Sequence, residues 1–197
     1  MEQFVQHWRV GRAAPLDAHL FLQEHLGLLL GGWAAVFVAR HKAQDWDRLC
    51  RLLLGDALTR AGEESPDLVI DFATLTGAAR SALGPDLPAL FARRDETGSA
   101  LLSAGLEHDD PCWRLPLHDA YREWLKSDIA DIMNSHANAY AGASVAALFL
   151  DRFVPEGVDW AHFDTFAWRP FTKPGRPKGG DALGLRAAWH MLKQRYA

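Results

Sequence analysis

The order of apolar and polar residues divides the chain into alternating strand-like and helix-like segments. Residues 67–84 read DLVIDFATLTGAARSALG, in which 68–75 are mostly apolar and β-prone and 78–83 are small, helix-compatible residues. Thr76-Gly77 separates the two halves, and Gly84-Pro85 is a typical helix stop. This stretch therefore predicts a buried strand, a tight turn and a short helix.

The remaining segments continue the alternation. Apolar spacing or small residues predict helices over residues 49–61, 95–106, 118–125, 142–150 and 181–196, and residues 1–50 are interpreted as mainly helical. Extended or strand segments are predicted near residues 87–91, in the turn 111–116 and over 160–168, with loops over 134–140 and 169–180. Strands that alternate with helices indicate the α/β class.

One apolar run tests whether the protein belongs in a membrane. Residues 26–39 (LGLLLGGWAAVFVA) carry no charge over 14 positions, whereas a membrane span needs about 20. Charged and polar residues flank the run on both sides, so a buried helix or strand pair is favoured, with an apolar surface that needs a partner as a further possibility. The N-terminus also lacks the apolar core and cleavage site of a signal peptide.

Composition narrows the class of protein further. The 197 residues are 49% hydrophobic and 23% charged, as in ordinary globular domains, and the net charge is −4. No long basic run is present, which disfavours a nucleic-acid binder. Cys50 and Cys112 form no CxxC motif and indicate a reduced, cytoplasmic protein.

The turn at 74–77 is the first candidate site. Ligands of α/β proteins bind at the carboxyl ends of strands, and a glycine there lets a ligand approach the backbone closely. The residues alone also allow a plain strand-to-helix turn. The sequence has no GxSxG, phosphate-loop or dinucleotide-binding motif, so those chemistries lack support.

Six segments in order resemble the leucine aminopeptidase (cytosol aminopeptidase) family: DLVIDFATLTGAARSALGPDLPALF, DPCWRLPL, KSDIADI, AGASVAALFLDRFV, WAHFDTFAW and GRPKGGDALGLRA. The resemblance implies that residues 51–197 are part of the family's catalytic region, a mixed sheet flanked by helices, and that residues 1–50 diverge. It also implies removal of N-terminal amino acids from peptides, two divalent metals (zinc, manganese or magnesium) and a homo-oligomer, usually a hexamer.

The resemblance assigns roles to individual residues. The family's signature Asn-Thr-Asp-Ala-Glu-Gly-Arg falls on residues 45–51, which places Asp47 on a metal ligand and Arg51 on the catalytic arginine. Leu49 falls on the glutamate that bridges the metals, and a leucine side chain cannot ligate a hard cation. Downstream, Thr74 and Gly77 are expected to shape the substrate pocket, and the Leu75 carbonyl is expected to accept from the substrate.

Two functions therefore stay open. The family's other metal ligands lie in segments containing Ser-Gly-Gly and Asp-Met-Gly-Gly, and residues 1–50 contain neither. The chain is either an aminopeptidase-family protein that is truncated or impaired in metal binding, or a non-catalytic paralogue or fragment that binds peptides or other subunits. Without the family's upstream strands, a sheet edge is expected to lose its usual neighbours, and residues 20–39 are the segment expected to cover it.

Other polar clusters are interpreted as structural. His108-Asp109-Asp110 with Cys112 imitates a metal site, but adjacent residues seldom point at one ion. His162 and Asp164 alternate on one predicted strand, a plausible ligand spacing, but a scaffold role is favoured.

Two charged clusters complete the candidates. Asp128 and Asp131 are expected to share a helical face with a solvated or capping role. The basic loop 169–180, with Arg169, Lys173, Arg176 and Lys178, is suited to binding an anion or to packing on a neighbouring subunit.

Overall fold

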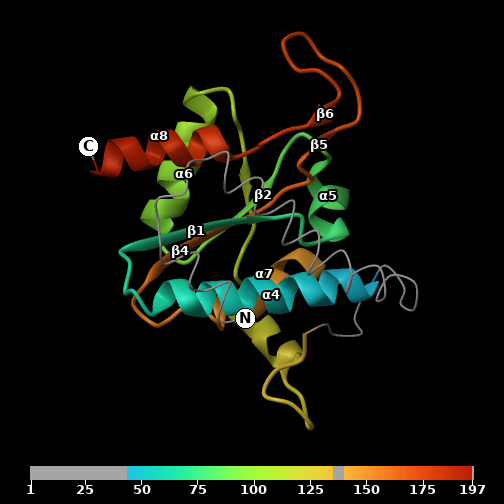
Figure 1. The fold of residues 1–197 in the computed structure, drawn as a ribbon, viewed down its shortest axis with the longest axis vertical. Coiled ribbons are helices and arrows are strands. Elements are labelled where there is room, and N and C mark those ends of the chain that lie inside the picture. Colours follow the sequence, from blue (N-terminus) through green and yellow to red (C-terminus); the bar gives the residue numbers. More distant parts are fainter. Residues whose placement is uncertain (1–43, 135–139, 197) are drawn as a thin grey trace, which may run out of the picture. The chain divides into compact units, whose positions relative to one another are not determined.

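A four-stranded mixed sheet lies at the centre of the described part of the protein (Figure 1). The computed structural model describes residues 44–134 and 140–196. The strands are, in spatial order, β1 (Leu68–Ala73), β4 (Asp159–Asp164), β2 (Ala89–Ala92) and β3 (Trp113–Arg114). β1 and β4 are parallel, β4 and β2 are antiparallel, and β2 and β3 are parallel. The α/β class and the mixed sheet are thus confirmed.

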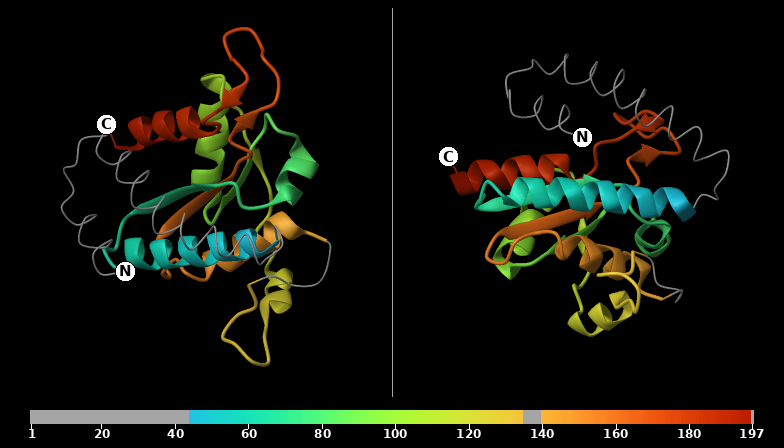
Figure 2. Two further views of the ribbon diagram at one scale, coloured as in Figure 1. Left: turned by 45° about the vertical axis from the view of Figure 1, so that its right-hand side comes forward. Right: turned by 60° about the horizontal axis from the view of Figure 1, so that its bottom comes forward.

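Helices cover both faces of this sheet (Figures 1 and 2). On one face α6 packs against α8, and on the other α7 and α4 enclose the larger core. The helical elements are α4 (Gln44–Gly62), α5 (Gly77–Leu83), α6 (Asp95–Glu107), the 3₁₀ helix η2 (Asp119–Leu125), α7 (Gly142–Asp151) and α8 (Leu185–Tyr196). A two-stranded sheet of β5 (Trp168–Arg169) and β6 (Gly179–Gly180) stands apart from the main sheet.

Strand β4 supplies side chains to both cores. All six of its residues are buried. Because side chains alternate along a strand, Trp160 packs into the core beneath α7, whereas Ala161 and Phe163 pack into the core beneath α6 and α8. β4 is therefore the strand around which the described part is built.

Three sequence predictions are wrong in detail. The strand predicted over 160–168 ends at Asp164, because the Asp164 side chain is tied to the neighbouring loop and Ala167 turns the backbone with φ 52°. Asp128 and Asp131 lie in bends, not on a helix. The last helix begins at Leu185 instead of at 181, after Gly184 with φ 85°.

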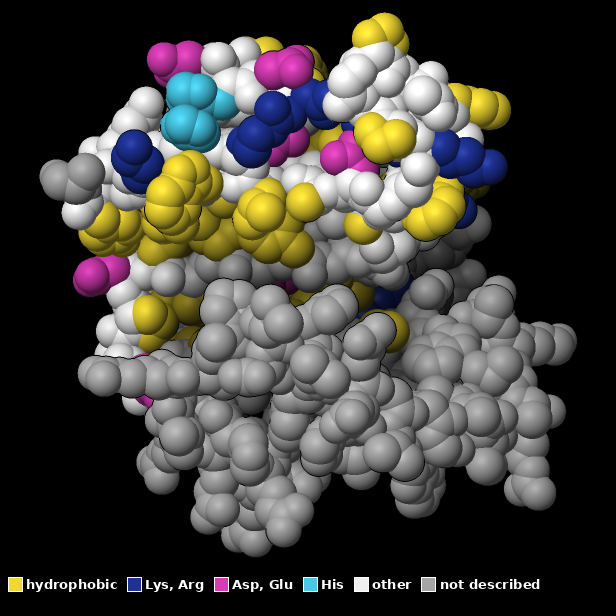
Figure 3. All heavy atoms as spheres, turned by 45° about the horizontal axis from the view of Figure 1, so that its top comes forward, with side chains coloured by type: hydrophobic (Ala, Val, Ile, Leu, Met, Phe, Trp, Pro, Cys, Tyr) yellow, Lys and Arg dark blue, Asp and Glu magenta, His cyan; other side chains and the backbone are white. Residues whose placement is uncertain are grey.

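Within the described residues, β1 is an edge strand of the sheet. Its Phe72 stacks on Phe163 with ring centroids 4.8 Å apart, yet remains 38% exposed. Figure 3 shows hydrophobic side chains exposed along a band on one face of the described part. Within the described ranges β1 has a strand partner on one side only, and residues 20–39, expected from the sequence to cover its other edge, lie outside the described part.

Helices able to cross a bilayer are not found in the described ranges, since none is both long and apolar enough.

Candidate functional site

The loop from β1 to α5 lies beside the end of β4. The two strands are parallel and in register, with Ala73 opposite Asp164, so their carboxyl ends meet at one edge of the sheet. The backbone N–H of Thr165 donates to the Ala73 carbonyl at 2.9 Å, which extends the pairing past both strands. This is where parallel strands of α/β proteins present ligand-binding loops.

Asp164 holds the loop in place. Its Oδ1 accepts from the backbone N–H groups of Leu75 (3.0 Å) and Thr76 (3.2 Å), and its Oδ2 accepts from the Thr76 hydroxyl (2.6 Å). The side chain is only 3% exposed. Burial raises the pKa of Asp164 above its ordinary value, although the Thr76 hydroxyl and His162 oppose that shift.

The loop then enters α5 without strain. Thr76 is the N-cap residue, and its Oγ1 accepts from the Ala79 N–H at 3.1 Å, as threonine at this position commonly does. Leu75 is 1% exposed and belongs to the larger core. One side chain anchors the loop in the core while its neighbours face outward.

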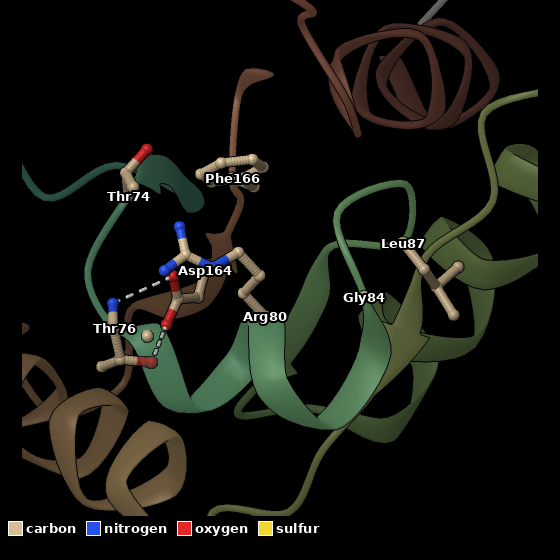
Figure 4. A pocket seen from close by; sticks show the side chains of 8 residues that line it. Thr74, Thr76, Arg80, Gly84, Leu87, Asp164 and Phe166 are labelled. Carbon is tan, nitrogen blue, oxygen red and sulfur yellow. Dashed lines mark hydrogen bonds between the residues drawn. The ribbon is translucent and has the colours of Figure 1, made fainter. Parts of the chain in front are cut away.

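A pocket of about 240 Å³ opens beside this loop (Figure 4). Its lining comes from the β1–α5 loop, from α5 and the segment after it, and from the end of β4 and the segment after it: Thr74, Thr76, Gly77, Arg80, Gly84, Leu87, Asp164 and Phe166. The structure thus brings together Thr74 and Gly77, which the sequence predicts as substrate-binding residues. Leu75, also predicted, directs its side chain into the core, and a role for its carbonyl stays a prediction.

Sequence reasoning missed Arg80 and Phe166. Arg80 follows Gly77 by three residues, which places the two on one face of a helix, so its helical spacing was an available signal. Phe166 follows β4, and nothing in the order of residues shows that this segment lies across from α5. Pairing of β1 with β4 brings it there.

Gly77 has room for a side chain. A Cβ built on Gly77 would meet only the Arg80 guanidinium, at 4.0 Å, whereas one on Gly62 would lie 2.4 Å from the Pro155 ring. Packing therefore requires a glycine at 62 but not at 77. The open space at Gly77 belongs to the pocket.

Asp47 and Arg51 lie on α4, and Arg51 is not among the residues that line the pocket. The Arg51 Nη1 donates to the Asn134 carbonyl at 2.8 Å, so this half-buried arginine joins α4 to the segment after η2. The side chain of Asp47 lies outside the described atoms. Their predicted roles as catalytic arginine and metal ligand stay predictions.

Among the side chains that the structure describes, no group of three histidine, cysteine or acidic residues is suited to a metal. The cluster at 108–112 has a structural role instead. The buried Asp110 carboxylate accepts from the backbone N–H groups of Gly184, Arg186 and Ala187, and so caps the start of α8. Burial raises the pKa of Cys112 to about 12, which keeps it a thiol. The described side chains therefore do not fit a two-metal centre.

The basic loop is held by internal ion pairs. Arg169 pairs with Asp86 at 2.8 Å and also with Asp181, and Lys173 pairs with Asp86 at 2.5 Å. Arg176 pairs with Asp109 at 2.7 Å. These partners neutralise three of the four cations, which leaves less charge for an external anion than the sequence suggests.

A second polar pair, Asp71 with the buried His162, joins β1 to β4. The Asp71 carboxylate contacts His162 Nδ1 at 2.5 Å and accepts from Trp160 Nε1 at 2.7 Å. Burial of the imidazole acts to lower the pKa of His162, but the charge and hydrogen bond of Asp71 outweigh it and raise the pKa above its ordinary value. His162 and Asp164 thus act as parts of the scaffold.

This pair predicts a pH dependence of stability. A histidine whose pKa is raised by folding stabilises the fold below its unfolded pKa, near 6.5, and loses that contribution as the pH rises through the folded pKa. We expect the free energy of unfolding to fall from pH 6 toward pH 9 in the natural protein, with a smaller fall in His162→Gln. Urea titrations across this range measure it, and equal slopes for the two proteins would contradict it.

Comparisons with known proteins agree with the fold. Residues 40–188 match the family model described as the cytosol aminopeptidase family, catalytic domain. A probable cytosol aminopeptidase of Rickettsia bellii is 42% identical over 150 residues, covering 74% of this chain and 30% of the relative. One from Syntrophotalea carbinolica is 44% identical over 146 residues, covering 73% and 29%.

Comparison with solved structures also finds a cytosol aminopeptidase. The cytosol aminopeptidase of Coxiella burnetii is 58% identical with a TM-score of 0.71, over 75% of this chain and 32% of that one. The bottromycin maturation enzyme BotP is 36% identical with a TM-score of 0.69, over 74% and 33%, and has also been solved in complex with Mn. The chain spans about a third of the length of these relatives. It belongs to the cytosol aminopeptidase family, and its matched residues fall in the catalytic domain of that family.

Proposed function

We propose that this chain binds the N-terminal end of peptides in the pocket beside Gly77, as the substrate-side part of an aminopeptidase catalytic domain. The observation that carries the proposal is the loop that Asp164 fixes over the end of β1, with Thr74 and the open space at Gly77 facing the pocket. The family reaction is the hydrolysis of N-terminal amino acids from peptides with two divalent metals, manganese, zinc or magnesium, to polarise the carbonyl and activate water.

The chain is proposed to be impaired in holding those metals. The described residues offer no suitable donor cluster, and Leu49 stands where the resemblance puts the bridging glutamate. Asp47 as a metal ligand and Arg51 as the catalytic arginine remain part of the proposal. The described residues can bind and orient a peptide, since Thr74 supplies a hydroxyl and the Leu75 carbonyl an acceptor.

A non-catalytic module is the second candidate. The edge of β1, which has no strand partner within the described ranges, and its partly exposed Phe72 favour it, because an open strand edge and apolar surface suit association with other subunits. Because the family usually forms hexamers, we propose that this chain associates with further copies of itself in a homo-oligomer. Because its relatives are named cytosol aminopeptidases, we propose the cytoplasm as its location.

Hydrolysis of leucine p-nitroanilide by the purified chain tests the proposal. With added manganese or zinc we expect no chelator-sensitive turnover, because the described residues do not fit a metal pair. Metal content measured on the same sample should stay below two ions per chain. Chelator-sensitive turnover with two tightly bound ions would contradict the proposed impairment and make the chain an aminopeptidase in its own right.

A further inference from the structure

The pocket contains a cation in a fixed position. Arg80 extends from α5 into the space between Asp164 and Phe166 (Figure 4). Its guanidinium carbon lies 4.4 Å from the centre of the Phe166 ring. Such stacking uses the flat face of a guanidinium and leaves the N–H groups at its edge free to bind a planar anion.

No described carboxylate neutralises Arg80. Asp164, the acidic residue that lines the pocket, has both oxygens engaged by the backbone and hydroxyl of the 75–76 loop. Within the described ranges Arg80 forms no ion pair, in contrast to Arg169 and Arg176, which have acidic partners. The positive charge of Arg80 is therefore available to a ligand.

The remaining lining fits a small polar group. Thr74 is exposed, and its hydroxyl makes no hydrogen bond with another described residue, so it can donate to a ligand oxygen. The volume of about 240 Å³ lies below the roughly 300–1,000 Å³ of sites for drug-sized ligands. A single side chain or a terminal carboxylate suits this space.

We propose that Arg80, stacked on Phe166, binds a carboxylate of a short peptide and makes this pocket prefer a peptide with a free carboxylate over its neutral amide. The proposal rests on the proposed function, since it takes peptides as the ligands. The carboxylate has two possible sources in a peptide: the side chain of an N-terminal glutamate or aspartate, and the free C-terminus of a dipeptide. Either would meet the guanidinium edge in the two-pronged geometry that arginine and carboxylate share.

Calorimetric titration of the full chain with four dipeptides tests the proposal. Glu-Leu-amide against Gln-Leu-amide isolates a side-chain carboxylate, and Leu-Leu against Leu-Leu-amide isolates the C-terminal one. We expect the charged member of at least one pair to bind about tenfold tighter, as for a charge-assisted hydrogen bond. Arg80→Gln should remove that difference, whereas Arg152→Gln, an exposed arginine that does not line the pocket, should retain it.

The outcomes separate this proposal from the one on which it rests. If the neutral amides bind with the same affinity as the acids, or if Arg80→Gln keeps the difference, the role of Arg80 is wrong while peptide binding stands. If no dipeptide binds the natural chain, both proposals are wrong. Since Arg80 is exposed, the variant should melt at the same temperature as the natural protein, and Arg80→Lys should recover part of the preference by restoring the charge.

Discussion

Replacing Asp164 with alanine is expected to lower the free energy of unfolding by about 3 kcal/mol and to weaken peptide binding at least tenfold. The substitution removes three hydrogen bonds and leaves the Leu75 N–H buried without an acceptor, and each such loss costs about 1–3 kcal/mol. The loop that lines the pocket would then no longer be held against β4. Urea denaturation and peptide titration measure the two effects.

Asp164→Asn is the matched variant for this prediction. It keeps one oxygen for the backbone N–H groups of Leu75 and Thr76, but presents an amide N–H₂ in place of the oxygen that accepts from the Thr76 hydroxyl. Its loss of stability should fall between those of the natural protein and the alanine variant. An alanine variant as stable as the natural chain would show that Asp164 does not hold the loop.

Arg93→Met is expected to cost about 3 kcal/mol of stability, because it removes several hydrogen bonds from a charged donor, each worth about 1 kcal/mol, while Arg122 still pairs with Asp151 at 2.7 Å. Arg93 donates to the Asp151 carboxylate at 2.6 Å and to four backbone carbonyls of residues 151, 154, 155 and 158. Those carbonyls lie in the turn between α7 and β4, and Asp151 is only 7% exposed. The arginine therefore determines how β4 enters the sheet.

The neighbouring Arg94 provides the control. It is 52% exposed, donates to the Gly157 carbonyl, and lies at 4.0 Å from Asp159. Arg94→Met should change the free energy of unfolding by no more than about 1 kcal/mol, as for a surface ion pair. Equal losses in the two variants, measured by urea denaturation, would contradict the assigned role of Arg93.

The sequence predicted those parts of the fold that local patterns determine. The strand at 68–73, the turn and the helix α5 with its stop at Gly84 follow from apolar spacing and from capping residues that act within a few positions. The end of β4 was not predictable in this way. It depends on hydrogen bonds that Asp164 accepts from residues 88 and 89 positions away, which a local pattern does not contain.

The residues of the candidate site show the same difference between local patterns, which the sequence reveals, and contacts between distant segments, which it does not. Thr74 and Gly77 were predicted because they lie in one short motif, whereas Phe166 reaches the pocket only through the pairing of β1 with β4. Asp164 was noted for its alternation with His162, but a ligand spacing on a strand does not reveal that both side chains are engaged by internal partners. Contacts between distant segments decide which polar residues remain free to bind.

Peptide titration of Gly77→Val most directly tests whether the pocket beside Gly77 binds the end of a peptide. A Cβ at this position meets only the Arg80 guanidinium, at 4.0 Å, so we expect the fold to tolerate the small valine side chain while the pocket is filled. The variant should keep the melting temperature of the natural protein and lose at least tenfold in affinity for Leu-Leu-amide. Unchanged affinity in a folded variant would show that peptides do not bind there.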